Sequence, residues 1–155
     1  MKKIKVLIVD DRDIIRDTLK LLFEDDNVIE ITDEAENGLE ALEKIKTNFY
    51  DVILMDYNMP GIKGAEVAEM LLAENSNLKI LAFSIIDNAF YINKILKKGV
   101  RGFIPKDSDK NIYKDAIIKV NNGEIFITQN IKKKLDNLQN NVFYRNDLNH
   151  SKAAS

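Results

Sequence analysis

The chain has 155 residues and a formal net charge of −2; hydrophobic residues make up 45% of it and charged residues 31%. This composition is typical of a globular protein that is long enough to bury its own core. The chain has no cysteine and one histidine, which excludes disulfides, thiolate nucleophiles, histidine metal clusters and histidine-based catalytic triads. Carboxylates, hydroxyls and amines are the side chains left for chemistry. The apolar stretch near the N-terminus, residues 6–9, is too short for a secretory signal or a membrane span, so we expect a cytoplasmic protein with no membrane contact.

Short apolar segments alternate with segments of helical periodicity along most of the chain. The predicted strands are residues 4–9, 28–31, 52–55, 80–83 and 102–104. The first predicted helix is expected to bury Ile14, Ile15, Thr18, Leu19 and Leu22, and the fourth Phe90, Tyr91, Ile95 and Leu96. Continuous apolar strands that alternate with helices predict an α/β fold, a doubly wound five-stranded parallel sheet with helices on both faces. We expect the order 2-1-3-4-5, because it places the first and third strands side by side and so brings Asp10, Asp11 and Asp56 together.

The pattern changes after Gly123. Ile131, Leu135 and Leu138 predict a marginal helix, and the asparagine-rich remainder from Asn140 is typical of a linker or a frayed tail. We therefore predict a domain over residues 1–122 and a C-terminal extension over 123–155 that is partly helical or disordered. Residues 129–155 contain five Lys or Arg and two Asp or Glu, whereas the rest of the chain is mildly acidic. We expect the chain itself to bind no nucleic acid.

Polar side chains stand where the predicted strands end. Asp10 and Asp11 follow the first strand, Asp56 the third, Ser84 the fourth and Lys106 the fifth. Ligands bind at the carboxyl ends of the strands in an open parallel sheet, so these groups are expected to lie together. Three crowded carboxylates repel one another unless a cation such as Mg²⁺ or Mn²⁺ sits among them. A carboxylate is the strong nucleophile that remains, and an ammonium and a hydroxyl nearby suit a phosphoryl group.

Four motifs resemble the receiver domain of response regulators from bacterial two-component systems. They are VDD at 9–11, MDYNMPG at 55–61, FS at 83–84 and GFIPKD at 102–107, and the resemblance covers about residues 3–122. It implies a flavodoxin-like fold. Ser84, the Asp that follows Lys106 and the segment GEIFITQNIKKKL are similar to the NarL/LuxR-like class, in which a DNA-binding helix-turn-helix domain follows the receiver. Such an output domain is not visible in these residues, so DNA would be contacted only through a domain not present here.

The resemblance assigns roles to the residues at the strand ends. Asp56 would accept a phosphoryl group from a sensor histidine kinase, with Asp10, Asp11, Asp56 and the backbone carbonyl of Asn58 around Mg²⁺. Asp10 would reach the metal mainly through water. The protein would then be a regulatory phosphoacceptor and not an enzyme, with only self-phosphorylation and self-dephosphorylation chemistry.

The same resemblance implies a switch. Ser84 and Lys106 would bind the phosphoryl group, and Ser84 and Phe103 would carry the change to the face formed by the fourth helix, fifth strand and fifth helix. A homodimer or an output domain is expected to dock there. The residues assigned to this face are Tyr91, Lys94, Lys98, Lys110 and Tyr113.

Two residues depart from the family pattern. Ile85 follows Ser84 where the family usually has Ala or Gly, and we expect it to narrow access to Asp56. Pro105 precedes Lys106 and removes one backbone donor at the end of the strand.

Other functions fit the sequence less well. A phosphohydrolase with an aspartyl nucleophile would carry an acid where Asn58 stands, and a flavodoxin would have a Ser/Thr/Gly-rich loop in place of Asp-Asp-Arg-Asp at 10–13. A nucleotide-binding GxxxxGK[ST] loop does not occur. One alternative stays open: a receiver-like binding module that signals without phosphorylation.

Overall fold

The computed structural model describes residues 2–59, 64–85 and 88–153, with side chains up to residue 141. Its elements in chain order are β1 (Ile4–Val9), α1 (Asp13–Leu22), β2 (Ile29–Ala35), α2 (Gly38–Thr47), β3 (Val52–Asp56), α3 (Gly64–Glu74), β4 (Ile80–Ser84), α4 (Ala89–Lys97), β5 (Gly102–Pro105), α5 (Lys110–Asn121) and α6 (Gln129–Ala153). Pro60 and Gly61, the last residues of the MDYNMPG motif, lie outside the described residues. Among the helices described here, none is long and apolar enough to cross a membrane.

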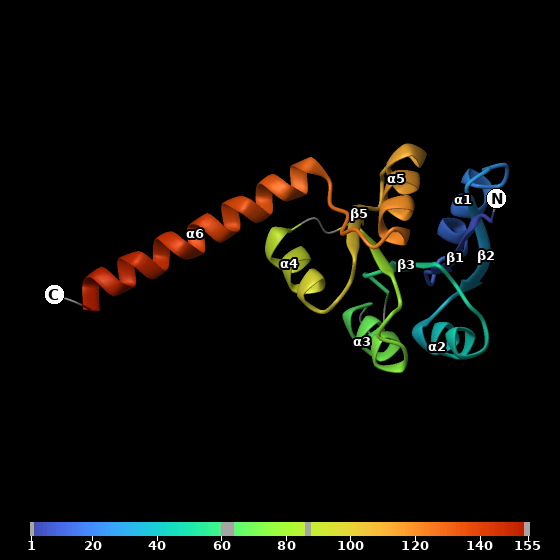
Figure 1. The fold of residues 1–155 in the computed structure, drawn as a ribbon, viewed down its shortest axis with the longest axis horizontal. Helices are drawn as coiled ribbons and strands as arrows, with labels where there is room; N and C mark the ends of the chain where they lie inside the picture. The colour runs from blue at the N-terminus through green and yellow to red at the C-terminus, as the bar shows by residue number, and fades with distance from the viewer. Residues whose placement is uncertain (1, 60–63, 86–87, 154–155) are drawn as a thin grey trace.

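The five strands form one parallel sheet in the order β2-β1-β3-β4-β5, which confirms the predicted topology. Helices α1 and α5 cover one face, and α2, α3 and α4 cover the other (Figure 1). The register places Val9 beside Met55, Asp56 beside Phe83 and Ser84 beside Pro105. The carboxyl ends of β1, β3, β4 and β5 are therefore aligned along one edge of the sheet.

Each strand buries side chains on both faces of the sheet. In β1, Val6 and Ile8 pack with α1 and α5, whereas Leu7 and Val9 pack with α2, α3 and α4. Successive side chains of a strand point to opposite faces, so a sheet covered on both sides requires a continuous apolar run. This is why the central strands lack an alternating pattern.

The edge strand β2 is longer than predicted. It runs to Ala35, whereas the sequence pattern ended it at Ile31 because acidic residues follow. Those residues are tolerated because β2 lies at the edge of the sheet, where side chains reach polar partners. Asp33 accepts hydrogen bonds from Lys44 Nζ at 2.8 Å and from Tyr50 Oη at 2.6 Å.

The buried faces of two helices differ from the prediction. Ile14 is 69% exposed and Thr18 is also exposed, while Arg16 is buried on α1. On α4, Phe90 is 69% exposed and Ile92 is buried. Apolar spacing does not fix the rotation of a helix about its axis when apolar side chains occur on more than one side. The strands against which α1 and α4 pack set that rotation.

The chain returns to the sheet after α5, at Phe126. The backbone N–H of Phe126 donates to the Arg101 carbonyl at 3.0 Å, and the N–H of Phe103 donates to the Phe126 carbonyl at 3.0 Å. A Cβ at Gly102 would lie 2.8 Å from the Phe126 carbonyl oxygen, so glycine permits this close approach. Ile131, in the first turn of α6, joins the core. The division at residue 122 stays a prediction, and packing continues nine residues beyond it.

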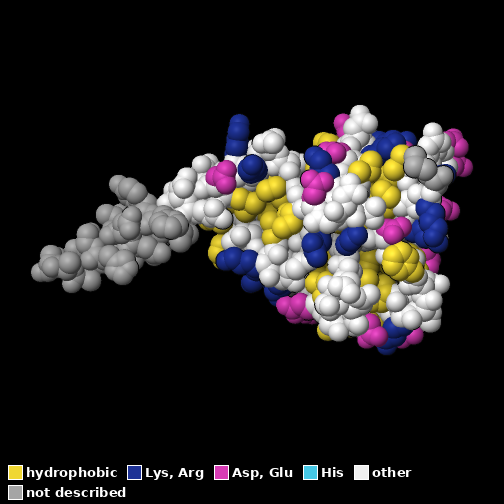
Figure 2. Space-filling model, viewed as in Figure 1, with side chains coloured by type: hydrophobic (Ala, Val, Ile, Leu, Met, Phe, Trp, Pro, Cys, Tyr) yellow, Lys and Arg dark blue, Asp and Glu magenta, His cyan; other side chains and the backbone are white. Residues whose placement is uncertain are grey.

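Helix α6 continues through the segment that the sequence pattern assigned to a linker or frayed tail. It runs without interruption from Gln129 to Ala153 and extends away from the sheet (Figure 1). On the face shown in Figure 2, acidic and basic side chains are interspersed over the sheet domain, and no continuous basic stripe is visible among the described side chains.

A buried carboxylate connects the loop after α1 to α5. Asp26 is 5% exposed and accepts hydrogen bonds from the backbone N–H groups of Val28 at 2.8 Å and Ile29 at 2.9 Å. Lys114 Nζ donates to it at 2.9 Å, and Lys110 Nζ lies at 3.5 Å. Burial raises the pKa of Asp26, but the hydrogen bonds from Lys114 and the two backbone amides outweigh it, and the pKa ends well below its usual range.

We predict that Asp26→Ala lowers the free energy of unfolding by about 2–3 kcal/mol at pH 7, because two backbone donors and two ammonium groups lose a charged acceptor. A depressed pKa contributes stability above the unfolded-state value of about 3.9, and this contribution is lost as the pH falls below it. The difference between the variant and the wild type should therefore shrink below about pH 4. Urea unfolding across pH measures both effects.

Asp25→Ala is the matched control, because Asp25 is the exposed neighbour of Asp26. Its effect should stay within about 0.5 kcal/mol. An equal loss in both variants would contradict the role given to Asp26.

Candidate functional site

Three carboxylates meet at the carboxyl edge of the sheet. Asp10 directly follows β1, Asp56 ends β3, and these strands are neighbours. One carboxylate oxygen from each of Asp10, Asp11 and Asp56 lies within 4.8 Å of the others. Asp10 and Asp56 are buried and Asp11 is exposed. The structure thus brings the acidic residues expected at the strand ends together, with one of them open to solvent.

Lys106 supplies a positive charge to the two buried carboxylates. Its Nζ lies 3.1 Å from Asp10 Oδ2 and 3.1 Å from Asp56 Oδ2, and its side chain is 7% exposed. The same ammonium lies 5.1 Å from the centroid of the Phe83 ring, which is a cation–π distance. Two buried carboxylates therefore share one ammonium that is largely shielded from water.

The backbone fixes the place of Lys106. Its N–H donates to the Ser84 carbonyl at 2.9 Å, across the β4–β5 ladder, and its carbonyl accepts a hydrogen bond from the Tyr113 hydroxyl at 2.9 Å. Burial raises the pKa of Tyr113, and the charges of Asp107, Asp10 and Asp56 raise it further. The Tyr113 hydroxyl therefore stays protonated as a donor over the physiological pH range.

Each buried carboxylate is also held by its own loop. Asp10 Oδ1 accepts from the backbone N–H of Arg12 at 2.8 Å, and Asp56 Oδ1 accepts from the backbone N–H of Asn58 at 2.9 Å. In both, the backbone N–H of residue i+2 donates to the carboxylate of residue i, which is the geometry of an Asx turn. One oxygen of each carboxylate thus faces its loop and the other faces Lys106.

The remaining residues at this edge lie close to the ion pairs. Ser84 is buried at the end of β4 and pairs in register with Pro105. Pro105 lies on the edge strand β5, where a missing donor is tolerated. Ile85 is 76% exposed, so its side chain is not packed over the buried carboxylates. The structure therefore gives no support to the expected narrowing by Ile85.

Phe103 occupies the core beneath this edge. It is fully buried and belongs to the cluster that contains Ile92 and Ile95 of α4 and Ile131 of α6. Its backbone N–H is bonded to the Phe126 carbonyl. A residue assigned to a switch thus contacts both the helix after β4 and the segment that leads into α6.

Two residues assigned to the docking face lie elsewhere, and that part of the prediction is wrong. Tyr113 is 3% exposed because it shares the sheet-facing side of α5 with Ala116 and Ile117. Lys110 lies toward Asp26 and 5.6 Å from the Phe23 ring, on the side of α1.

The other three residues of that face have different environments. Lys98 pairs with Glu69 on α3, Lys94 is exposed, and Tyr91 is half-buried. The Tyr91 hydroxyl donates to the Tyr57 carbonyl at 3.4 Å. Burial raises the pKa of Tyr91, and the charge of Asp56 adds to the shift.

Sequence reasoning missed Arg16 and the packing role of Tyr113 near the site. A signal for both was available in the helical spacing. Arg16 precedes the buried Leu19 by three positions, and Tyr113 precedes the buried Ala116 by three. Residues three apart share a helix face, so the spacing placed each polar side chain near a buried apolar one without deciding which face of the helix would be buried.

The donor set fits a small divalent cation. Carboxylate oxygens from adjacent strands converge, one of the three acids is exposed, and hard oxygen ligands are those that Mg²⁺ prefers. Asp10, Asp11 and Asp56 are the residues that would hold such an ion. The partial screening by Lys106 leaves the cluster with an excess of negative charge.

Comparison with known proteins identifies the family. The sequence pattern of the response regulator receiver domain matches residues 6–118. The chain belongs to this family. Receiver domains of response regulators are signalling modules of two-component systems and not classical enzymes.

Its relatives are NarL/LuxR-type regulators. The chain is 32% identical over 142 residues to the transcriptional regulatory protein DegU of Brevibacillus brevis, which covers 89% of this chain and 60% of the relative. It is 30% identical over 132 residues to the response regulator UvrY of Escherichia coli, which covers 85% of this chain and 61% of the relative. The chain thus spans about three-fifths of the length of these relatives.

Solved structures show the same fold. A LuxR-family response regulator from Aurantimonas superposes with a TM-score of 0.83 at 22% identity, covering 89% of this chain and 99% of that one. The signal receiver domain of a NarL response regulator from Mycobacterium tuberculosis superposes with a TM-score of 0.74 at 30% identity, covering 80% of this chain and 100% of that one. The flavodoxin-like fold is therefore confirmed.

We predict that Lys106→Met lowers the free energy of unfolding by about 3–5 kcal/mol, because it leaves two buried carboxylates without their shared cation. Chemical denaturation in the presence of a chelator measures this. Adding Asp10→Asn to Lys106→Met should restore part of the loss, since one of the stranded charges is then gone.

Lys98→Met is the control, because Lys98 pairs with one acid, Glu69, whose side chain is 54% exposed. That exposed pair should contribute no more than about 1 kcal/mol. If the Lys106 variant were no less stable than the Lys98 variant, the electrostatic account of the site would be wrong.

Proposed function

We propose that this protein is a phosphoacceptor that takes a phosphoryl group onto Asp56 from the phosphohistidine of a sensor kinase. The observation that carries the proposal is the meeting of three carboxylates within 4.8 Å with an ammonium 3.1 Å from two of them. Receiver domains act with sensor kinases, which agrees with the family to which the chain belongs.

The transfer needs little more than positioning. A carboxylate oxygen of Asp56 attacks the phosphorus, a new O–P bond forms as the N–P bond of the phosphohistidine breaks, and the imidazole nitrogen keeps the electron pair. The loop hydrogen bond from Asn58 orients the Asp56 carboxylate. Lys106, already within contact distance of that carboxylate, is placed to pair with the phosphoryl oxygens as a point charge.

The metal proposed for this site is Mg²⁺, with Mn²⁺ as an alternative, held by Asp10, Asp11, Asp56 and the backbone carbonyl of Asn58. When bound, it supplies positive charge to the phosphoryl oxygens as charge develops on them. Asp11 is the exposed member of the cluster, so the ion would enter the site from solvent on the side of Asp11.

The output proposed is control of transcription. The relatives include proteins named as transcriptional regulators, and the chain spans about three-fifths of their length. We propose that the receiver acts through a DNA-binding domain or a recruited partner, while the sheet domain itself binds no nucleic acid. The interspersed charges visible in Figure 2 agree with this division of roles.

We predict that Asp56→Asn abolishes the gain of one phosphoryl group when the protein is incubated with Mg²⁺ and a small acyl phosphate. Intact mass measures the gain directly. The amide can still accept a hydrogen bond from Asn58 and fill the same space, so the loss reports the missing nucleophile.

Asp115→Asn is the control, because Asp115 is an exposed acid on α5 that pairs with Lys119. It should be phosphorylated at the wild-type rate. Labelling of the Asp56 variant at the wild-type rate would refute the assignment. A wild-type protein that takes no phosphoryl group would favour a binding module that signals without phosphorylation.

We further propose that Ser84 and Phe103 relay the phosphorylation state. The phosphoryl group adds about −1.5 to −2 charges and three acceptor oxygens next to the end of β4, and Ser84 would turn its hydroxyl toward them. Phe103 belongs to the same buried cluster as Ile92, Ile95 and Ile131, so repacking under the β4–α4 loop would reach both α4 and α6. The two packings would be populated according to their differential affinity for the phosphoryl group.

The docking surface proposed for a homodimer or an output domain is the α4–β5–α5 face, now without Tyr113 and Lys110. Its remaining residues are Tyr91, Lys94 and Lys98, of which the two lysines are exposed. A structure titled as two RcsB dimers bound to two parallel DNAs has the same fold.

We predict that a phosphoryl mimic changes amide exchange in residues 84–114 and at the start of α6, around Ile131. The contacts of Phe103 are the physical reason. Hydrogen-exchange mass spectrometry with and without the mimic measures this, and Asp56→Asn treated in the same way is the control. Changes confined to the loops after β1 and β3 would leave the relay without support.

A further inference from the structure

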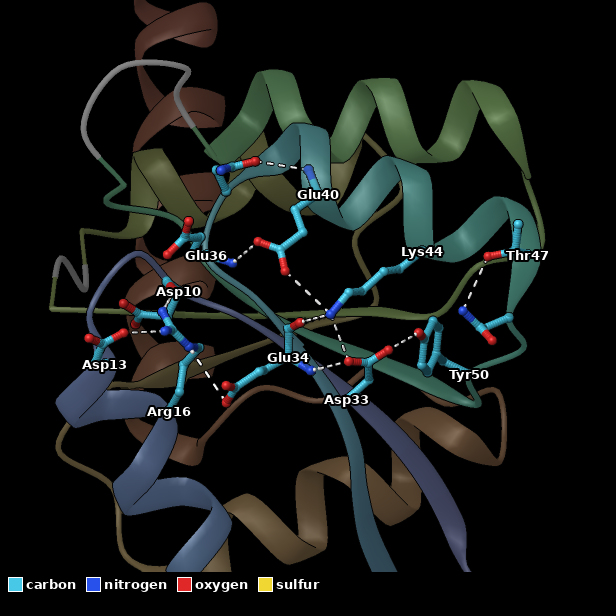
Figure 3. Close-up of polar contacts among 12 residues, drawn as sticks. Asp10, Asp13, Arg16, Asp33, Glu34, Glu36, Glu40, Lys44, Thr47 and Tyr50 are labelled. Carbon is cyan, nitrogen blue, oxygen red and sulfur yellow. Dashed lines mark hydrogen bonds and ion pairs between the residues drawn. The ribbon is translucent and has the colours of Figure 1, made fainter.

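A buried arginine lies directly behind the acidic cluster. Arg16, on α1, is 7% exposed, although arginine is rarely buried without close partners. Figure 3 shows its guanidinium reaching toward the end of β1 on one side and toward Glu34 on the other. The phosphoryl transfer proposed for Asp56 assigns no role to the Arg16 guanidinium.

The first contact is with the backbone of a site residue. Arg16 Nη1 donates to the carbonyl oxygen of Asp10 at 2.6 Å. The β1–β2 register ends with Val9 beside Ala35, and the last backbone bond runs from the Asp10 N–H to the Ala35 carbonyl at 3.1 Å. The Asp10 carbonyl therefore lies just past the end of the ladder.

Strand β2 does not supply the next donor. In a parallel ladder that donor would be the N–H of Asn37, but β2 ends at Ala35 and Asn37 is the N-cap of α2. Arg16 takes the place of the missing backbone donor at Asp10. A buried carbonyl without a donor is costly, so this contact favours one path for the chain between Asp10 and α1.

The other guanidinium nitrogens hold the arginine in place. Nη2 is hydrogen-bonded to the carboxylate of Asp13, at the start of α1, and Nε lies 3.6 Å from Glu34 Oε2 on β2. Lys20 Nζ reaches the same Glu34 oxygen at 2.7 Å. The planar guanidinium thus joins the end of β1, the first turn of α1 and the edge strand, which an ammonium could not do with the same geometry.

We propose that Arg16 is a positioning residue for the divalent-cation site, because it fixes the turn between β1 and α1 on which Asp10 and Asp11 present their carboxylates. The inference rests on the proposed function of the acidic cluster. Arg16 acts through the Asp10 carbonyl and not by contact with the metal or the phosphoryl group, in the way that outer partners orient metal ligands.

The test compares Mg²⁺ binding by the full chain and by Arg16→Met, using calorimetry on the unphosphorylated proteins. Methionine keeps much of the apolar stem and removes every donor. We expect Mg²⁺ affinity to fall about tenfold to a hundredfold, the range for outer partners of metal ligands. The Mg²⁺ concentration for half-maximal phosphorylation by a small acyl phosphate should rise in parallel, while the rate at saturating Mg²⁺ changes less.

Lys20→Met is the matched control. Lys20 shares the Glu34 oxygen with Arg16 and lies on the same helix, and it pairs with Glu34 and Asp17, not with Asp10. Its Mg²⁺ affinity should stay within about twofold of the wild type, since no metal-ligand partner is removed. Arg16→Lys keeps the charge and should recover part of the affinity, and it carries the test if Arg16→Met does not fold.

The outcomes separate the two proposals. If the Arg16 variants unfold at lower temperature but bind Mg²⁺ as the wild type does, Arg16 is only a structural residue and the inference is overturned. If Arg16→Met and Lys20→Met lose affinity equally, the effect is one of local charge, which also overturns it. A wild-type protein that binds no Mg²⁺ would instead overturn the proposed function of the cluster.

Discussion

The ion pairs of Lys106 with Asp10 and Asp56 are the interaction on which the site depends. The two carboxylates are almost fully buried, so they have lost most of their hydration and would repel each other. The cation between them compensates for both costs. The parallel sheet makes the arrangement possible, because β1, β3 and β5 deliver these three side chains to the same edge. The Asx turns at Asp10 and Asp56 then leave one oxygen of each carboxylate directed at the lysine.

The same edge is connected to the rest of the domain by contacts of two kinds. Polar contacts lead outward from Asp10 through Arg16 to Glu34 on the edge strand (Figure 3). Lys20 of α1 pairs with the same Glu34 carboxylate. Apolar contacts lead inward from β5 through Phe103 to α4 and to Ile131 of α6. The acidic edge therefore has a polar network on one side and an apolar layer on the other.

Much of this was determined by the sequence. Continuous apolar strands between amphipathic helices are compatible with few folds other than a parallel sheet covered on both faces, and β1 and β3 must be neighbours if Asp10 and Asp56 are to meet. The residues at the strand ends could be identified for the same reason, since the carboxyl ends of parallel strands share one edge. Composition narrowed the chemistry, because a chain without cysteine and with one histidine has few nucleophiles other than a carboxylate.

Tertiary structure alone decided which polar side chains would be buried and what they would touch. The rotation of α1 and α5 about their axes depends on packing against the sheet, so Arg16 turned inward while Ile14 remained exposed, and Tyr113 left the predicted docking face. The length of β2 depended on its place at the edge, where Asp33 finds Lys44 and Tyr50. The packing of Phe126 and Ile131 depended on the space beside Gly102 and Phe103. Each of these outcomes rests on contacts between segments far apart in the chain, and local periodicity carries no information about such contacts.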